Sequence, residues 1–200
     1  MNANLGRLQD GYTTGVRRLV GDLVAKVTRL PITANQVTAA GFVLNAVAAV
    51  LIYRETWIAA GVVFLVGSIL DIFDGAVARS RGEAGPRGAF IDSTLDRISE
   101  ALVLGAAGLV FARQGEEIAL AAVFVALTAS FMTSYARAKA ESFGLDGTHG
   151  FMARAERVVL IGAALLFAPL GVLPYGIELL AVLSALTLAQ RSRHVLRQLS

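Results

Sequence analysis

Apolar segments long enough to cross a lipid bilayer recur along most of this chain. A transmembrane helix needs roughly 20 mainly apolar residues. Hydrophobic residues make up 56% of the 200 residues and charged residues only 16%, well below the quarter that is typical of soluble domains. No internal repeat or soluble second domain is visible. We therefore predict an all-α integral membrane protein, with residues 1–200 forming a single membrane domain.

The apolar pattern divides into six candidate transmembrane helices, at about residues 35–53, 56–78, 89–112, 117–138, 156–173 and 175–190. Residues 15–30 differ, because their apolar residues recur at i, i+3, i+4 and i+7 and their basic residues lie on the opposite face. This pattern predicts an N-terminal amphipathic helix that lies in the membrane interface. An ordinary amphipathic helix packed on a core is the alternative.

The basic residues test this count of helices. With six spans, every Lys and Arg except Arg54 and Arg113 lies on one side of the membrane or in a helix end that leads to it. The positive-inside rule then places both termini in the cytoplasm. A pI of about 9.7 could suggest a nucleic-acid binder, but the position of the basic residues matters more than their number. We therefore expect a multi-pass protein of the cell membrane and no nucleic-acid partner.

Four aspartates lie in or beside the apolar segments, where acidic side chains are costly and usually functional. Asp71 and Asp74 are neighbours on one helix face, and Asp92 and Asp96 share a face of the next helix. The short loop of residues 80–88 makes the two helices antiparallel, so the four carboxylates can converge near the cytoplasmic ends. Taken singly, each aspartate could instead be a solvated or packing residue.

Converging carboxylates repel one another unless they bind protons or a cation. The ligands would all be oxygens, because the chain has no cysteine and no suitably placed histidine, and this favours Mg²⁺ or Mn²⁺. Two such ions between four acids would form a clamp for phosphoryl displacement. A divalent-cation transporter is the alternative from another functional class.

The spacing D-x-x-D-G-x-x-A-R, followed after eight residues by G-x-x-x-D-x-x-x-D, resembles the signature of the CDP-alcohol phosphotransferase family. Its defined positions are filled by Asp71, Asp74, Gly75, Ala78, Arg79, Gly88, Asp92 and Asp96. Six spans after an interfacial helix are also similar to this family, so the resemblance extends over nearly the whole chain.

This resemblance implies an enzyme that transfers a phosphatidyl group from CDP-diacylglycerol to an alcohol and releases CMP. It assigns Asp71, Asp74, Asp92 and Asp96 to two divalent ions, Mg²⁺ or else Mn²⁺, and makes Asp96 also the base that deprotonates the attacking hydroxyl. It further implies a homodimer with its active site facing the cytoplasm. The residues that it assigns to the CDP-lipid are Thr33, Ala34, Asn35, Gln36, Gly75, Arg79, Gly85 and Gly88.

Basic residues gather on the same side of the membrane as the aspartates, among them Arg137, Lys139, Arg154, Arg157 and Arg191. Several guanidinium groups aimed at one cavity would suit a phosphorylated acceptor. Positive-inside bias alone is the plainer alternative.

Residues 134–157 are similar to a segment of the bacterial phosphatidylinositol phosphate synthases of this family, with the run S-Y-A-R-A-K-A-E and the later pair Glu156 and Arg157. That resemblance implies that the five basic residues hold inositol phosphate as the acceptor. Glycerol 3-phosphate is the alternative acceptor for the same chemistry. Two departures from the pattern occur: residues 33–36 lack the Pro and Asp of a T-P-D-V-like turn, and Ala155 replaces a proline.

Overall fold

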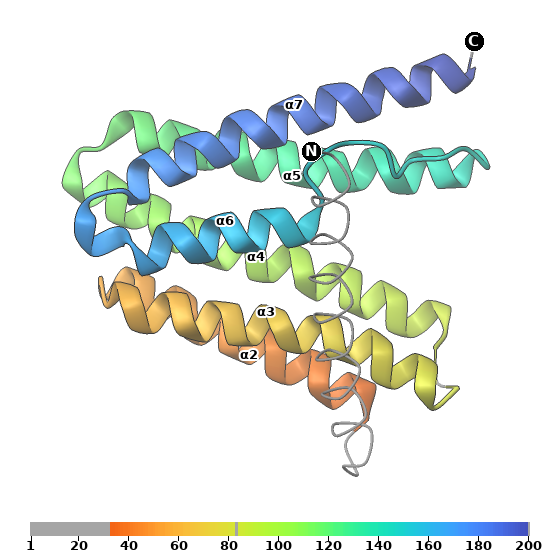
Figure 1. Ribbon diagram of the computed structural model, residues 1–200, viewed down its shortest axis with the longest axis horizontal. Coiled ribbons are helices and arrows are strands. Elements are labelled where there is room, and N and C mark those ends of the chain that lie inside the picture. Colours follow the sequence, from red (N-terminus) through yellow and green to blue (C-terminus); the bar gives the residue numbers. More distant parts are fainter. Residues whose placement is uncertain (1–32, 83, 200) are drawn as a thin grey trace, which may run out of the picture.

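The structure, a computed structural model, describes residues 33–82 and 84–199 (Figure 1). Every regular element within these ranges is helical, which confirms the predicted all-α class. The elements are α2 (Ala34–Tyr53), α3 (Trp57–Ser80), α4 (Pro86–Gln114), α5 (Glu117–Ser142), α6 (Arg154–Leu166), the 3₁₀ helix η1 (Ala168–Leu170) and α7 (Leu173–Leu199). The interfacial helix predicted at residues 15–30 lies outside the described residues.

Local sequence sets the ends of several helices. Thr33 caps α2, because its hydroxyl accepts from the Gln36 N–H at 3.3 Å and the Gln36 side chain accepts from the Thr33 N–H at 2.9 Å. Pro86 opens α4, where a missing N–H costs nothing. Gly115 ends α4 with a left-handed φ of 74°, which glycine adopts without strain.

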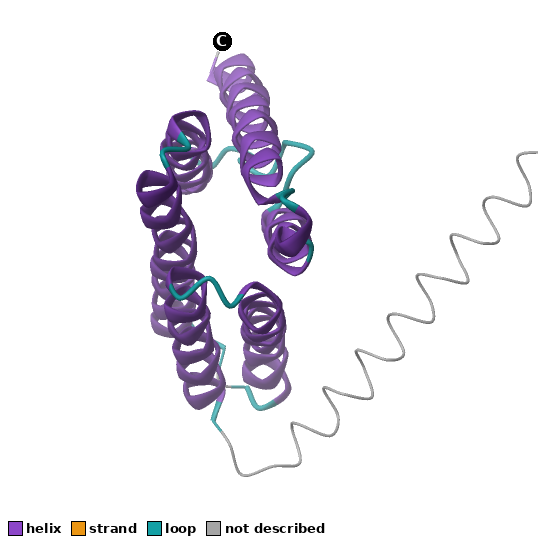
Figure 2. Cartoon of the chain, turned by 90° about the vertical axis from the view of Figure 1, so that its left-hand side faces the viewer, coloured by secondary structure: helices purple, strands orange, loops and turns teal. Residues whose placement is uncertain are grey.

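The α-helices of the described ranges form a closed ring in the order α2, α3, α6, α7, α5, α4, and each packs against its two neighbours. Figure 2 shows this ring from its end. The last residues of α3, α5 and α7 and the first residues of α2, α4 and α6 gather at one end of the molecule, on the right of Figure 1. Residues far apart in the sequence therefore meet at that end, which we call the site end.

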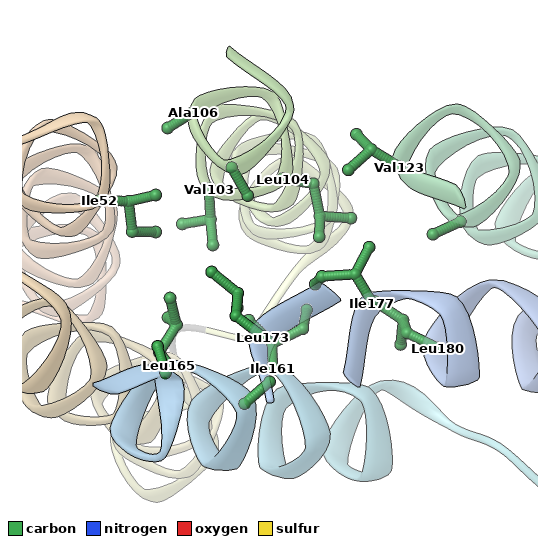
Figure 3. Packing of buried hydrophobic residues seen from close by; sticks show 14 of the residues in the cluster. Ile52, Val103, Leu104, Ala106, Val123, Ile161, Leu165, Leu173, Ile177 and Leu180 are labelled. Atoms are coloured by element: carbon green, nitrogen blue, oxygen red, sulfur yellow. The ribbon is translucent and has the colours of Figure 1, made fainter. Parts of the chain in front are cut away.

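A buried apolar cluster fills the middle of the ring (Figure 3). Ile52, Leu165 and Ile177 come from three different helices, and all are at most 1% exposed. Small residues allow the helices to approach closely: a Cβ at Gly162 of α6 would lie only 2.4 Å from the Leu65 side chain of α3. This packing fixes the positions of the helices that carry the site.

Four helices, α2, α3, α5 and α7, are long and apolar enough to span a bilayer. Large apolar side chains such as Ile58, Ile118 and Phe124 remain exposed on α3 and α5, as expected where lipid replaces water. Helix α4 is not counted with these four helices, because it carries several charged residues and is less apolar. Helix α6 has 13 residues, which make about 20 Å of helix at 1.5 Å per residue.

The range 156–173, predicted as one span, contains a shorter helix. Helix α6 ends at Leu166, and η1 follows it. Pro169 lacks the N–H that would continue the helix, and Gly171 turns the chain with a φ of 76°. The other predicted ranges each overlap one helix, and α7 continues past residue 190 to Leu199.

Candidate active site

Helices α3 and α4 carry the four aspartates into the site end of the ring, and α2 packs against both helices. Asp71 and Asp74 are buried, with 8% and 4% of their surface exposed. Asp92 lies close enough to Asp71, Asp74 and Asp96 for its negative charge to repel theirs. Within residues 33–82 and 84–199, however, no three acidic or histidine side chains surround one point closely enough to act as metal ligands where they stand.

A guanidinium group bridges two of the aspartates. The Nη2 atom of Arg154, the first residue of α6, lies 2.8 Å from Asp71 Oδ2 and 2.5 Å from Asp96 Oδ1. The two carboxylate side chains are 5% and 12% exposed, whereas the Arg154 side chain is 36% exposed. Sequence reasoning assigned Arg154 to the acceptor, and the structure also joins it to two predicted metal ligands.

Helix α2 contributes two site residues that sequence reasoning missed. Thr38 donates its hydroxyl to Asp74 Oδ2. Gly41 makes room for Asp71, because a Cβ at this position would lie 2.1 Å from Asp71 Oδ1. Thr38, Gly41 and the buried Asn45 share one face of α2 at the spacing i, i+3 and i+7. Polar and small residues at helical spacing in an apolar helix were the available signal.

A groove of about 640 Å³ opens beside Asp74 and Asp92, within the size range of ligand pockets. Its other lining residues are Thr33, Ala34, Asn35, Thr38, Gly75, Ala78, Arg79, Ala84, Gly85, Pro86, Arg87, Gly88 and Ala89. The groove therefore contains every residue predicted to bind the CDP-lipid except Gln36. That side chain instead completes the N-terminal cap of α2.

Three glycines shape the wall of the groove. A Cβ at Gly85 or Gly88 would meet no atom within 4 Å, so both positions face open space. A Cβ at Gly75 would lie 3.3 Å from Nη1 of Arg79, which shows that the Arg79 guanidinium folds back over this glycine. A side chain at any of these positions would narrow the groove or displace Arg79.

The donor set of the site suits a hard divalent cation. All four aspartates offer only carboxylate oxygens, which Mg²⁺ and Mn²⁺ prefer. Asp92 Oδ1 is buried and has no hydrogen-bond partner among the described residues. A buried carboxylate oxygen without a partner is unfavourable unless a cation or a proton compensates it.

A second, smaller cavity of about 20 Å³ lies behind Asp96, with room for about one water molecule. Its polar lining comes from Asn45, Ser68, Asp96, Ser99, Glu100, Arg154 and Arg157. Arg157 is only 7% exposed, and its Nε lies 3.1 Å from Glu100 Oε1. Ser130 donates to the other oxygen of Glu100 at 2.7 Å. Arg154 and Arg157 both lie on α6, and they line the same cavity as Asp96, the predicted base on α4.

Arg191 is equally buried, but its contacts are with the backbone. Its nitrogens donate to the carbonyl oxygens of His149 at 2.8 Å, Thr133 at 3.0 Å and Thr148 at 3.3 Å. The bonds to His149 and Thr148 tie the loop between α5 and α6 to α7, and the bond to Thr133 joins α7 to α5. Arg137 and Lys139 lie on the exposed end of α5. There Arg137 pairs with Glu141 at 2.8 Å, and the Lys139 Nζ lies 4.6 Å from the centre of the Phe143 ring.

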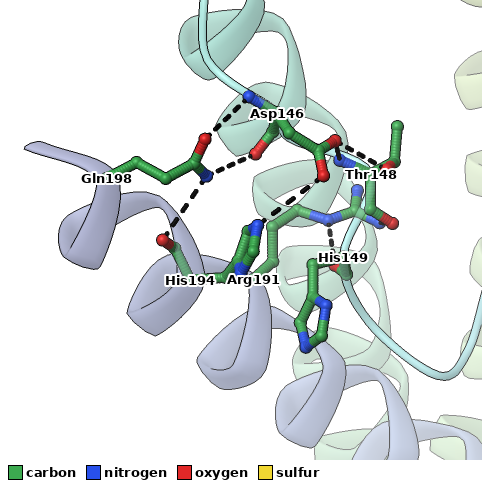
Figure 4. A network of polar contacts seen from close by, with 6 residues as sticks. All are labelled: Asp146, Thr148, His149, Arg191, His194 and Gln198. Atoms are coloured by element: carbon green, nitrogen blue, oxygen red, sulfur yellow. Dashed lines mark hydrogen bonds and ion pairs between the residues drawn. The ribbon is translucent and has the colours of Figure 1, made fainter.

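A polar network fastens the same loop to the end of α7 (Figure 4). Gln198 bonds both the N–H and the carbonyl of Asp146, at 3.0 and 2.9 Å. The hydroxyl and N–H of Thr148 donate to Asp146 Oδ1, and these bonds hold the pKa of Asp146 below its usual range. The rings of His149 and His194 stack with their centres 4.5 Å apart. The loop that leads to Arg154 is therefore held at several points.

Comparisons with known proteins agree with this geometry. Residues 31–189 match the profile of the CDP-alcohol phosphatidyltransferase family. The archaetidylinositol phosphate synthase of Pyrococcus horikoshii is 38% identical over 164 residues, which cover 81% of this chain and 82% of that protein. The phosphatidylinositol phosphate synthase of Mycobacterium tuberculosis is 32% identical over 182 residues, which cover 87% and 84%.

Solved structures show the same fold. The crystal structure of the Mycobacterium tuberculosis phosphatidylinositol phosphate synthase with CDP-DAG bound superposes with a TM-score of 0.79 and 29% identity, over 89% of this chain and 94% of that chain. A second crystal structure of the same enzyme, in complex with manganese and citrate, has a TM-score of 0.78. The present chain belongs to the CDP-alcohol phosphatidyltransferase family and is a membrane-bound CDP-alcohol phosphotransferase.

Proposed function

We propose that this enzyme transfers the phosphatidyl group of CDP-diacylglycerol to inositol phosphate, forming phosphatidylinositol phosphate and CMP. The observation that carries the proposal is the groove of about 640 Å³, which joins two of the aspartates to the residues expected to hold the CDP-lipid. The relatives from Pyrococcus horikoshii and Mycobacterium tuberculosis are both named as synthases of a lipid with an inositol phosphate headgroup. The first is an archaetidyl enzyme and the second a phosphatidyl enzyme, so these names favour the acceptor more strongly than the lipid chains.

Asp71, Asp74, Asp92 and Asp96 are proposed to hold two divalent ions, Mg²⁺ or Mn²⁺. When bound, these ions would neutralise the diphosphate of the donor and stabilise charge that develops during transfer. The hydroxyl of Thr38 orients the Asp74 carboxylate from the side of α2. The groove wall formed by Gly75, Arg79, Gly85 and Gly88 would admit the CDP group close to the backbone.

Asp96 is proposed as the general base. In the transfer, the acceptor's hydroxyl oxygen bonds to the phosphorus that carries the diacylglycerol, the bond from this phosphorus to CMP breaks, and Asp96 receives the hydroxyl proton. Arg154 lies 2.5 Å from the base and Arg157 follows it on the same helix, so an acceptor phosphate held by these arginines would place its alcohol near the carboxylate. Arg137, Lys139 and Arg191 are proposed as outer members of the same basic cluster.

The proposed topology keeps six membrane crossings, with both termini and the site on the cytoplasmic side and residues 1–200 as one domain. Support comes from the ring, in which successive helices run in opposite directions and place the aspartates and arginines at one end (Figure 1). A homodimer in the cell membrane belongs to the same proposal and rests on family resemblance.

The test is CMP release from CDP-diacylglycerol by the purified full chain in detergent with Mg²⁺. Parallel reactions contain inositol phosphate, glycerol 3-phosphate, free inositol or no acceptor. We expect CMP with inositol phosphate alone. Release with glycerol 3-phosphate instead would retain the donor site and overturn the acceptor.

A second assay separates catalysis from transport. Vesicles that contain the protein are loaded with an Mn²⁺-sensitive dye and tested without any CDP-lipid. The proposal predicts no ion flux under these conditions. Ion flux together with no CMP in the first assay would favour a divalent-cation transporter.

A further inference from the structure

Arg154 contacts the two aspartates whose roles in the proposed function differ most. Its Nη2 lies between Asp71, a proposed metal ligand, and Asp96, the proposed base, at 2.8 and 2.5 Å. The three residues come from α6, α3 and α4, so this contact joins three helices of the ring. The same nitrogen serves both carboxylates, and it occupies the space between their facing oxygens.

A divalent cation that bridges Asp71 and Asp96 would take the same two facing oxygens, Asp71 Oδ2 and Asp96 Oδ1. Carboxylates bind Mg²⁺ at about 2.0–2.1 Å, closer than the guanidinium nitrogen stands here. Two positive groups cannot both take these oxygens at such distances, because their mutual repulsion is strong in a site with little exposure to water. Arg154 and a cation held by Asp71 and Asp96 therefore exclude each other from this position.

The surroundings of Arg154 offer its side chain another partner. Arg154 is the first residue of α6, and no side chain caps this helix end. The free N–H groups and the dipole of a helix N-terminus favour a bound anion. The side chain is more exposed than either carboxylate, so it can turn away while the aspartates stay buried. A phosphate near the start of α6 would satisfy both the helix end and the guanidinium.

We propose that Arg154 and a divalent cation compete for the carboxylates of Asp71 and Asp96, and that cation binding releases Arg154 to the phosphate of the acceptor. The inference rests on the metal-ligand role that the proposed function gives to the aspartates. It makes cation and acceptor binding positively coupled, and each must raise the affinity for the other by the same factor.

Mn²⁺ alone, titrated into the purified full chain and followed by electron paramagnetic resonance, tests the competition. Arg154→Gln should bind Mn²⁺ about tenfold more tightly than the unmodified chain, within the usual range of coupling between sites. Arg157→Gln is the matched control, because it removes the same charge from the same helix but from a side chain paired with Glu100. Its Mn²⁺ affinity should stay close to that of the unmodified chain. Arg154→Lys keeps the charge but loses the several N–H donors of the guanidinium group. Its Mn²⁺ affinity should lie between those of Arg154→Gln and Arg157→Gln, and this variant provides the test if Arg154→Gln does not fold.

A second titration follows inositol phosphate binding with and without Mn²⁺. The ion should raise this affinity in the unmodified chain, and most of the rise should vanish in Arg154→Gln. Equal Mn²⁺ affinity in the unmodified chain, Arg154→Gln and Arg157→Gln would overturn the competition and leave the metal site standing, provided that Asp71→Asn weakens Mn²⁺ binding. Mn²⁺ binding that Asp71→Asn does not change would overturn both the metal site and this inference.

Discussion

Burying several carboxylates near one another costs free energy, and each aspartate of the site meets this cost differently. Asp74 accepts a hydrogen bond from Thr38. Asp71 and Asp96 share the charge of Arg154. Asp92 keeps one buried oxygen without a partner among the described residues. Arg154 thus offsets the negative charge of Asp71 and Asp96. A cation would contribute most beside Asp92, whose buried oxygen has no partner in the described part of the chain.

Asp96→Asn tests the proposed base. The amide cannot accept the proton of the hydroxyl, so kcat should fall by about 10²–10⁴-fold. Binding of CDP-diacylglycerol should be largely retained, as measured by thermal stabilisation of the purified variant. Glu117→Gln, which makes the same change from carboxylate to amide at an exposed residue at the start of α5, is the matched control and should keep normal turnover. Near-normal kcat in Asp96→Asn would remove this residue from the base role.

Arg191→Gln tests whether Arg191 acts through the loop that it holds. Loss of its bonds to three carbonyls should destabilise the protein by about 2 kcal/mol, the range of a hydrogen bond to a charged group. The melting temperature in detergent should fall, and KM for inositol phosphate should rise with it. Arg193→Gln, an exposed neighbour on α7, should change neither quantity. A raised KM with an unchanged melting temperature would indicate direct contact with the acceptor instead.

At the scale of the elements, α2 is more than a membrane anchor. It packs against both helices that carry the aspartates, and its face with Thr38, Gly41 and Asn45 lies at the site. The absence of a side chain at Gly41 lets α2 approach Asp71 and the backbone of Gly67 closely. The distance between α2 and α3 therefore helps to set the position of the first aspartate.

Gly41→Ala should damage the site without changing any charged residue. The added Cβ would lie 2.1 Å from Asp71 Oδ1, so either the carboxylate or the helix must move. Because misplacement by about 1 Å can cost on the order of 100-fold in rate, we expect a kcat loss of that size. Gly105→Ala is the matched control in α4, since a Cβ there meets no atom within 4 Å. Equal kcat values for the two variants would show that the contact between Gly41 and Asp71 is not needed.

At the scale of the whole molecule, the closed ring places every proposed functional group at one end. Helices α2, α3 and α4 supply the groove, and α6 supplies Arg154 and Arg157. The apolar cluster of Figure 3 holds these helices together deeper in the ring. The site end can therefore hold charged residues and an open groove, because the packed middle of the ring keeps the helices in place.

The proposed topology predicts which loops face the cytoplasm. The chain has no cysteine, so single cysteines can be introduced and labelled without removing others. A membrane-impermeant maleimide added to intact cells should label Thr56→Cys and Glu116→Cys. Ser80→Cys and Ser142→Cys should react only after the membrane is permeabilised. Labelling of Ser142→Cys in intact cells would contradict six crossings with a cytoplasmic site.

Helical structure and the chemical character of the site could be predicted from the sequence because both depend on short spacings. Apolar runs of span length predicted helices that the structure contains at α2, α3, α5 and α7. The spacing of Asp71 and Asp74 places them on one helix face wherever that helix lies. The same local reasoning overestimated the length of the helix at residues 156–173, because composition alone did not reveal the turn made by Pro169 and Gly171.

Only the tertiary structure decided which groups these side chains meet. Arg154 lies 83 positions from Asp71 in the sequence, and the packing of α6 against α3 brings them to 2.8 Å. Arg191 had the same apparent role as Arg157 in the sequence, yet its donors bind backbone carbonyls of the loop between α5 and α6 and of α5 itself. The sequence by itself therefore determined where the helices lie and which acidic and basic residues the site contains, because the spacing of residues sets which of them share a face of one helix. The ring of helices decided the pairing of acids with arginines, because such contacts depend on how separate helices pack.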